Sequence, residues 1–360
     1  MIVNSVTLKN FRNFAYDKIY FEKGVNILVG KNGQGKTNVL EAVSFCSFLK
    51  SFRAAKEEQL IRFGEQSASI LIEYSNKNNT ESIEILINRD GNKVLKHNGM
   101  TVTKNRELVG CFLSILFTPD HLNLIKEGPN KRRNFIDMAL CSLDIKYTDS
   151  LLRYQKVLSQ RNALLKKENV IAPLLEVYDE KLAEIGSYIV VRRSEYLKKL
   201  EGFAKTIFAD ISKSENKLKL LYINQYAKDV ESREQIARAM LARFEKTRAA
   251  DINFKMTTSG PQKDDILVLQ NGKSLKYFGS QGQIRSAVLS LILAQADVIY
   301  DKYGDFPVIM LDDILSELDR TRQKYIFSGS RASQVIVSTC ESAKARGKGN
   351  IIKVSGGRIV

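Results

Sequence analysis

A glycine-rich segment early in the chain has the residue types and spacing of a phosphate-binding loop. It fits the pattern G-x-x-x-x-G-K-[ST], and its residues are Gly30, Lys31, Asn32, Gly33, Gln34, Gly35, Lys36 and Thr37. Glycines let backbone N–H groups turn toward a phosphate, while the lysine reaches the β- and γ-phosphates and the threonine hydroxyl binds Mg²⁺. The segment therefore predicts a site for ATP and Mg²⁺, and a plain glycine turn is the weaker alternative.

Two adjacent aspartates follow an apolar run near the C-terminus. The run Val308 to Leu311 predicts a buried strand, and Asp312 and Asp313 stand at its carboxyl end, where open α/β sheets bind ligands. Because side chains alternate along a strand, the two carboxylates are expected to point apart. Asp312 would hold Mg²⁺, and Asp313 would polarise the water that attacks the γ-phosphate. A strand-ending turn without chemistry is the alternative.

A third segment places a hydroxyl and a glycine before a small-residue helix. Ser280, Gln281, Gly282 and Gln283 precede the helical pattern that begins at Ile284. The first N–H groups of a helix bind anions, so this is a second candidate phosphate contact. Since the chain has one phosphate loop, we expect a dimer in which this segment caps the γ-phosphate held by the partner. An ordinary helix cap made by Ser280 is the alternative.

The elements that must position these segments alternate between strand and helix patterns. We expect strands at 2–8, 18–21, 25–29, 217–223, 308–311 and 334–338, hairpins over 66–102 and over 266–278, and helices from residue 37, over 231–246 and over 283–296. Asp90-Gly91, Asn98-Gly99 and Asn271-Gly272 predict type I′ turns. Between 122 and 204 the apolar spacing is helical, with charged residues on the other faces. The pattern predicts an α/β fold with an inserted helical arm.

Composition limits the partners. The 360 residues suggest two or three domains, and 56 Lys and Arg against 40 Asp and Glu give a net charge of +16. Half of this excess lies in residues 320–360, where nine bases, Lys344, Arg346 and Lys348 among them, accompany the single acid Glu341. Such a field attracts nucleic acid, although it can be merely a soluble surface.

Other classes of protein do not fit the sequence. The N-terminus lacks a signal-peptide pattern, and no apolar run reaches the roughly eighteen residues of a membrane span, so we expect no membrane partner. The four cysteines stand far apart without a C-x-x-C pair, and there are only two histidines, His97 and His121. A disulfide scaffold and a zinc site are therefore not expected, and a reducing cytoplasm is the expected compartment.

Taken in order along the chain, these motifs resemble those of the ABC-type ATPase heads of the SMC and Rad50 class, and most closely those of the RecF family of recombination mediators. The resemblance extends along essentially the whole chain, and the matching segments are 9–14, 30–42, 128–137, 154–164, 259–265 and 311–319. The resemblance implies a P-loop ABC-type ATPase head, formed by 1–121 with 205–360, and a helical arm, lobe II, formed by 122–204. A coiled coil of SMC length is excluded, because only 275 positions separate Thr37 from Asp312.

The resemblance also implies roles for individual residues. Gly30 to Thr37 would bind ATP, Thr37 and Asp312 would hold Mg²⁺, and Lys36 and Asp313 would serve hydrolysis. Ser280, Gly282 and Gln283 would be contributed in trans across an ATP-dependent homodimer. The chain departs from the family at Gln262-Lys263, where His-Arg is usual, and it has no histidine near Thr339 after the last expected strand. Roles for these positions and for Arg53 stay open.

The implied function is ATP-dependent binding of duplex and single-stranded DNA near gaps, in recombinational repair and replication restart. Slow ATP hydrolysis would release the DNA, and RecR and RecO would be the protein partners. Two alternatives belong to other classes: the nucleotide-binding subunit of a transporter, and a non-hydrolysing DNA-binding structural protein. The charged insert between 122 and 204 argues against the first, and the intact Lys36, Thr37, Asp312 and Asp313 argue against the second.

Overall fold

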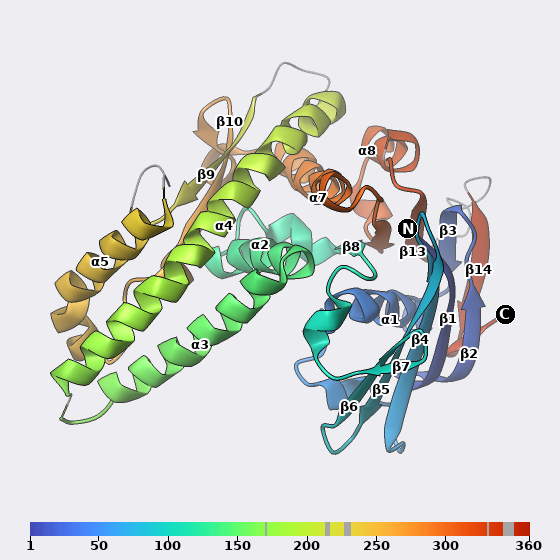
Figure 1. Cartoon of the computed structure of the whole chain (residues 1–360). Coiled ribbons are helices and arrows are strands. Elements are labelled where there is room, and N and C mark those ends of the chain that lie inside the picture. Colours follow the sequence, from blue (N-terminus) through green and yellow to red (C-terminus); the bar gives the residue numbers. More distant parts are fainter. Residues whose placement is uncertain (170, 213–216, 227–231, 330, 341–348) are drawn as a thin grey trace. The chain divides into compact units, whose positions relative to one another are not determined.

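The computed structural model describes the chain except residues 170, 213–216, 227–231, 330 and 341–348 (Figure 1). The described residues form two compact units, Met1–Asn123 with Val288–Val360, and Leu124–Ala287. The boundary between Asn123 and Leu124 lies two residues after the boundary expected at 121/122. The second unit extends to Ala287, whereas the expected helical arm ends at 204. It does so because a later helix and three short strands pack with the helical arm. The division into an ATPase domain and an arm stays a prediction.

The first unit contains a largely parallel sheet in the order β15-β14-β3-β13-β12-β8. Its strands are β3 (Gly24–Val29), β8 (Ser114–Phe117), β12 (Val308–Asp312), β13 (Gln334–Thr339), β14 (Asn350–Ser355) and β15 (Arg358–Ile359). All are parallel except β15, and every residue of β12 and β13 is buried, as is typical of parallel sheets. Helix α1 (Lys36–Phe48) packs against β8, β12 and β13. The register brings the carboxyl ends of β3, β12 and β13 to one edge.

Strands β14 and β15 correct the sequence-based expectation, which ended the sheet at 338 and left a basic tail. The apolar positions Ile352 and Val354 of β14 are buried, and this strand pairs in parallel with β3. Between β12 and β13 lie α8 (Arg320–Lys324), preceded by the 3₁₀ turn Leu315–Glu317 and followed by a π-helical turn at Tyr325–Gly329.

A second sheet of the first unit is antiparallel, in the order β2-β1-β4-β5-β6-β7. Its strands are β1 (Ile2–Phe11), β2 (Phe14–Tyr20), β4 (Ser67–Ser75), β5 (Thr80–Asn88), β6 (Lys93–His97) and β7 (Met100–Val102), and 3₁₀ turns lie at Glu57–Leu60, Asn105–Leu108 and Pro119–Asn123. Asn98 and Gly99 both have positive φ, as expected of a type I′ turn. At Asp90-Gly91 only the glycine has a positive φ, so the prediction of a type I′ turn is wrong there. Asp90 Oδ1 instead accepts a hydrogen bond from Asn92 N.

The second unit is built on long helices, which confirms the helical spacing of 122–204. These are α2 (Pro129–Leu143), α3 (Ile145–Leu165), α4 (Ala172–Ser212) and α5 (Arg233–Phe254), and α3 and α5 run beside α4 (Figure 1). The Asp144 side chain caps α3 by accepting from Tyr147 N, and Ser232 caps α5 in the same way. Helix α5 continues eight residues beyond the expected end at Lys246.

The same unit holds a three-stranded antiparallel sheet in the order β11-β10-β9. Strands β9 (Leu218–Ile223) and β10 (Asp265–Gln270) are followed by the expected Asn271-Gly272 turn and by β11 (Lys273–Ser274). The expected strand at 275–278 is wrong: this segment is the single helical turn α6 (Leu275–Phe278), closed by Gly279 N donating to Leu275 O at 3.1 Å. Only Leu275 of α6 is buried, so the alternation that a strand would need is absent.

Helix α7 (Gln281–Tyr303) is long and apolar enough to cross a membrane by length and composition. Its most apolar window, however, has a mean hydropathy of 1.2, and 78% of that window is buried. Within the described part of the chain it is the one helix that passes this test. Burial of this extent is typical of a core helix in a folded domain.

Candidate functional site

The glycine-rich loop lies between β3 and α1, as the sequence predicts. Gly33 and Gly35 have φ of 78° and 116°, a region that other residues rarely adopt. A Cβ atom on Gly30 would stand 2.2 Å from the carbonyl oxygen of Val354 on β14, so the close approach of the two backbones requires glycine there. Gly35 is the N-cap of α1 and has no side-chain hydrogen bond to cap the helix. The loop and the helix start therefore form an anion-binding arrangement.

Lys36, the first residue of α1, is buried and its ammonium group is held by the loop itself. Nζ donates to Gly30 O at 2.5 Å and to Lys31 O at 2.9 Å, and it lies 3.4 Å from Cys340 Sγ at the end of β13. Cys340 Sγ is also 2.7 Å from Asn32 Oδ1. These contacts keep the cation inside the loop, where it can meet the phosphates of a nucleotide.

Thr37 and Asp312 come together although they are far apart in sequence. Thr37 Oγ1 donates to Asp312 Oδ1 at 2.8 Å, and Ser338 Oγ of β13 donates to the same oxygen at 2.8 Å. Asp312 is only 8% exposed. Hydroxyl and carboxylate oxygens are the donors that Mg²⁺ prefers, so the residues present fit that ion.

The described residues contain no cluster of three or more His, Cys, Asp or Glu side chains that could hold a metal. A site with one carboxylate and one hydroxyl suits an ion that takes its remaining ligands from nucleotide phosphates and water, as Mg²⁺ usually does. It does not suit zinc, which needs three or four protein ligands.

Asp313 differs from Asp312 in exposure and in backbone conformation. It is exposed, has a φ of +49°, and its N–H donates to Ser338 Oγ at 2.9 Å. The two carboxylates do lie in different environments, as strand alternation suggested. The physical cause is different, however, because β12 ends at Asp312 and Asp313 belongs to the following turn.

Three polar residues outside the loop hold its shape. Asn13 Nδ2 donates to Gln34 O at 2.9 Å, Asn38 Nδ2 donates to Asn13 Oδ1 at 2.8 Å, and Arg53 Nη1 donates to Asn38 Oδ1 at 3.2 Å. Arg53, whose role the sequence left open, is thus linked to the phosphate loop through two asparagines. No spacing rule identifies this chain of contacts, because its members come from a strand connection, a helix and a loop.

A buried ion pair anchors α1 beneath the loop. Glu41 is fully buried and accepts two hydrogen bonds from Arg12, Nε at 2.9 Å and Nη2 at 2.8 Å, and one from Ser51 Oγ at 2.5 Å. Arg12 also donates to Gln59 O at 2.8 Å. The bidentate geometry fixes the orientation of α1 relative to β1 and the 51–59 loop.

The Ser280–Gln283 segment belongs to the second unit and starts α7. Ser280 N donates to Gln283 Oε1 at 2.8 Å, and Gln283 N donates to Ser280 Oγ at 3.3 Å. This reciprocal pair is a capping box. Both side chains are exposed, while Gly282 is half-buried. The ordinary-cap alternative therefore accounts for the side-chain contacts of the isolated chain, and the role in trans stays a prediction.

Gln262 and Lys263, which replace the family's usual His-Arg, have different environments. Gln262 Oε1 accepts from Tyr154 OH at 2.7 Å and its Nε2 donates to Ser259 O at 2.6 Å, whereas Lys263 is exposed. Gln262 therefore ties the 259–263 turn to α3, a positioning role within the second unit.

The next residue, Asp264, is 1% exposed and accepts from Tyr222 OH at 2.5 Å. Arg193 Nη1 lies 3.9 Å from the same oxygen, and the other oxygen, Oδ1, has no hydrogen-bond partner among the described residues. Burial raises the pKa of Asp264 to about 6, and the Tyr222 hydrogen bond and the charges of Arg193 and Arg133 oppose that shift.

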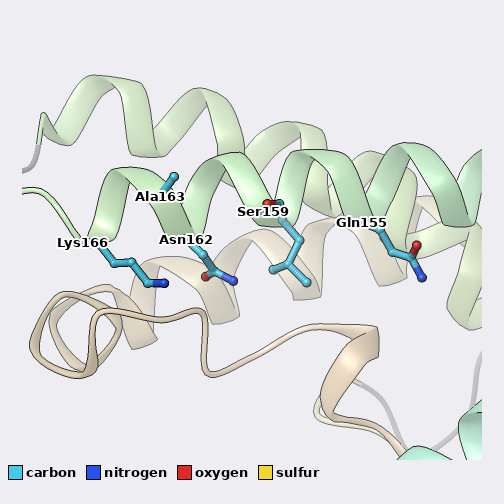
Figure 2. Close-up of a pocket in the computed structure, with 6 residues that line it drawn as sticks. Gln155, Ser159, Asn162, Ala163 and Lys166 are labelled. Atoms are coloured by element: carbon cyan, nitrogen blue, oxygen red, sulfur yellow. The ribbon is translucent and has the colours of Figure 1, made fainter. Parts of the chain in front are cut away.

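A pocket on α3 carries no site, and contact of the basic C-terminal stretch with DNA stays a prediction. A shallow pocket of about 430 Å³ lies along α3 (Figure 2), lined by Gln155, Leu158, Ser159, Asn162, Ala163 and Lys166. Asn162 in it accepts from Thr257 N and Oγ1 at 2.8 and 2.7 Å, and none of the candidate nucleotide-site residues lines it. Of the basic C-terminal stretch, Lys344, Arg346 and Lys348 lie outside the described residues.

Comparison with known proteins gives a consistent result. The family model described as "RecF/RecN/SMC N terminal domain" matches residues 2–358. Proteins described as "DNA replication and repair protein RecF" match from Clostridium tetani, at 38% identity over 94% of this chain and 93% of the relative, and from Clostridium acetobutylicum, at 36% over 100% and 99%.

Solved structures agree. The structure described as the recombination mediator protein RecF-ATPrS in the RecFOR pathway has a TM-score of 0.94 at 35% identity, covering 99% of this chain and 97% of that one. Its RecF-ATP counterpart has a TM-score of 0.92 at 34% identity, covering 100% and 97%. An Smc head domain from Pyrococcus furiosus has a TM-score of 0.57 at 19% identity, covering 100% and 96%, which indicates a shared fold alone. The fold is that of an ABC-type ATPase head, as the sequence predicted.

Proposed function

The chain belongs to the RecF family, and from this premise we propose that it is an ATP-dependent DNA-binding protein of recombinational repair and replication restart. Curated relatives of this length and identity are described as DNA replication and repair proteins, and two solved relatives hold ATP or an analogue described as ATPrS. Family membership removes the reason to consider a transporter subunit. The cytoplasm is the compartment in which this function would be performed.

The single observation that carries the proposal is the convergence of Thr37 and Asp312 beside the phosphate loop. A glycine turn without a nucleotide would have no need for a hydroxyl and a carboxylate from two distant segments at 2.8 Å. In the proposed site Gly30 to Thr37 bind the phosphates of ATP, and Thr37 and Asp312 hold Mg²⁺. When bound, Mg²⁺ neutralises charge on the β- and γ-phosphates.

ATP would act by closing a homodimer. The second chain would contribute Ser280, Gly282 and Gln283 to the γ-phosphate, and Asp313 would polarise the attacking water. Because only the closed dimer contacts ATP from both sides, ATP favours that state by its differential affinity, and hydrolysis reverses the preference. The closed dimer would bind duplex and single-stranded DNA near gaps, and RecR and RecO would act with it.

Sedimentation equilibrium tests this proposal. The chain is measured alone, with ATP and Mg²⁺, with ADP and Mg²⁺, and with ATP plus gapped DNA. We expect dimers with ATP but not with ADP, and the tightest association when gapped DNA is present. A monomer under all four conditions contradicts the proposed switch. A phosphate-release assay on the same samples separates a slow ATPase from a non-hydrolysing DNA-binding protein.

A further inference from the structure

Two neighbouring aromatic side chains of α6 stand in solvent just before the Ser280 segment. Tyr277 and Phe278 are 72% and 74% exposed, and their ring centroids lie 6.4 Å apart in an edge-to-face arrangement. Leu275, in contrast, is 2% exposed and anchors the turn, so the exposure of the rings does not result from an unpacked segment. Two adjacent exposed rings offer flat apolar faces to a ligand, and aromatic side chains are enriched at binding surfaces.

One lysine contacts this pair, and three more lie on or beside the strands that lead to it. Lys276 Nζ lies 5.5 Å from the centroid of the Tyr277 ring. The strand register places Lys219 of β9 in one row with Leu269 and Ser274, the residue that precedes α6. Lys217 is joined to the turn before β11, because its carbonyl accepts from Asn271 N at 2.9 Å. We name Lys217, Lys219, Lys273, Lys276, Tyr277 and Phe278 the aromatic–lysine patch.

The strands and the helical turn that carry the patch hold few acids, and the carboxylate that reaches β9 from α4, Glu201, accepts from Leu220 N at 2.5 Å through Oε2 and pairs with Lys205 at 2.6 Å through Oε1. Strands β9, β10 and β11 and helix α6 contain one acid, Asp265, and this carboxylate is bound by Arg132 through Nε at 2.7 Å and Nη2 at 3.0 Å. After Asp265 the sequence has no Asp or Glu until Asp297. A ligand of this surface must therefore combine negative charge with flat apolar faces.

A single strand of nucleic acid has both properties. Its bases present free faces that stack on aromatic rings, and its phosphates pair with nearby lysines. Duplex DNA offers the same phosphates, but its bases are already stacked on one another. We propose that the aromatic–lysine patch is a contact site for single-stranded DNA, in which Tyr277 and Phe278 stack on unpaired bases and the four lysines bind the adjoining phosphates. This inference rests on the proposed function and specifies where that function meets the unpaired strand.

The test uses the full chain with ATP and Mg²⁺ and a fluorescently labelled oligothymidylate, with binding measured by anisotropy and association of the chains by sedimentation. The double variant Tyr277→Ala/Phe278→Ala should lose about tenfold or more in affinity. This is the range expected when the aromatic side chain under a stacked base is removed. Tyr277→Leu/Phe278→Leu should lose as much, because it keeps apolar bulk but removes the flat faces. Tyr277→Phe should bind normally. A matched control, Tyr16→Ala/Tyr20→Ala, removes two rings that are 66% and 67% exposed on β2 and should bind like the unaltered chain.

The lysines are tested through salt dependence. Lys273→Ala/Lys276→Ala should reduce the slope of log affinity against log salt by about 0.7 for each lost contact with the single strand. Duplex of the same length should bind the aromatic variants as well as the unaltered chain. In a direct test, an oligonucleotide carrying 5-iodouracil should photocrosslink to Tyr277 or Phe278, located by mass spectrometry.

The possible results distinguish a failure of the aromatic–lysine patch from a failure of the proposed function. Unchanged single-strand affinity in the alanine double variant, an equal loss for duplex, or crosslinks that map elsewhere would overturn the patch while leaving DNA binding intact. If the double variant binds single strands normally but no longer associates with ATP, the rings are a contact between subunits and not a DNA site. If the unaltered chain binds neither single strands nor duplex, the proposed function fails together with the patch.

Discussion

The hydroxyl of Thr37 donates a 2.8 Å hydrogen bond to Oδ1 of Asp312, which stands 275 positions later in the chain. The register of the parallel sheet produces this contact. Asp312 of β12 is paired with Ser338 of β13, and Ser338 is paired with Leu28 of β3, so the carboxyl ends of three strands meet beside the phosphate loop. The candidate nucleotide site is therefore assembled by strand order, and α1 only completes it.

Replacing Lys36 with Ala should abolish ATP binding and, with it, ATP-induced association. The ammonium group that would offset the charge of the β- and γ-phosphates is lost, and no other cation donates to both loop carbonyls that Lys36 Nζ contacts in the described structure. Isothermal titration with ATP and Mg²⁺ measures the first effect, and sedimentation measures the second.

The matched control is Lys31→Ala in the same loop. The Lys31 side chain is exposed, and its carbonyl, which the substitution keeps, is the group that Lys36 contacts. This variant should bind ATP nearly as the unaltered chain does. Normal ATP affinity in Lys36→Ala would show that the loop is not the nucleotide site.

Replacing Asp313 with Asn should slow hydrolysis without weakening ATP binding. The exposed carboxylate that would polarise the water is lost, while the Thr37 and Asp312 pair that would hold Mg²⁺ remains. Asp312→Asn is the comparison, and it should instead weaken Mg²⁺-dependent ATP binding. Phosphate release and ATP titration on both variants test the assignment, and hydrolysis at the unaltered rate in Asp313→Asn contradicts it.

The sequence predicted the elements that carry the candidate site residues better than it predicted the contacts around them. The phosphate loop and the apolar strand before Asp312 are local patterns, so their elements could be assigned from spacing. The hydrogen bonds from Asn13 to Gln34 and from Asn38 to Asn13 could not be predicted, because they depend on how a strand connection and a helix meet in three dimensions. No sequence pattern predicts that Asn13 and Asn38 lie beside the phosphate loop.

Short elements near turns were the other source of error. Leu275–Phe278 has the composition of a strand, but β11 pairs with β10 only at Lys273 and Ser274, after which the chain makes a helical turn. β14 was missed because its alternation is brief and follows a basic stretch; pairing with β3 determines its conformation. In both places tertiary contacts decide between conformations that the local sequence leaves nearly equal.

Replacing Ser280 with Arg should prevent ATP-induced association while leaving ATP binding by the monomer intact. The phosphate loop is unchanged by this substitution, but the arginine adds bulk and charge where a second chain would approach. Ser280→Ala is the control: it removes only the hydroxyl that accepts from Gln283 N, at a cost of about 1 kcal/mol in helix capping. The alanine variant should therefore still fold. Dimers of Ser280→Arg with ATP would falsify the role in trans.

Replacing Asp264 with Asn should remove a pH dependence of stability that this carboxyl imposes. Burial raises its pKa to about 6 in the folded chain, above the ordinary 3.8, so the folded state holds the proton more tightly than the unfolded state. The stability from that proton is fully present below about pH 4 and is lost as the pH rises through about 6. The shift corresponds to roughly 3 kcal/mol. Relative to Asp264→Asn, the unaltered chain should therefore lose unfolding free energy between pH 4 and pH 6.

Urea unfolding of both proteins across this pH range measures the difference in their unfolding free energies. The contributions of the carboxylates that both proteins share cancel in that difference. Tyr222→Phe supplies the companion variant, because the Tyr222 hydroxyl donates to Asp264 Oδ2 and lowers the pKa of the carboxyl against the effect of burial. Without that hydrogen bond the loss of stability should move to higher pH. Parallel curves for Asp264→Asn and the unaltered chain would show that Asp264 titrates normally, and that Arg193 and Arg133 keep it ionised in the fold.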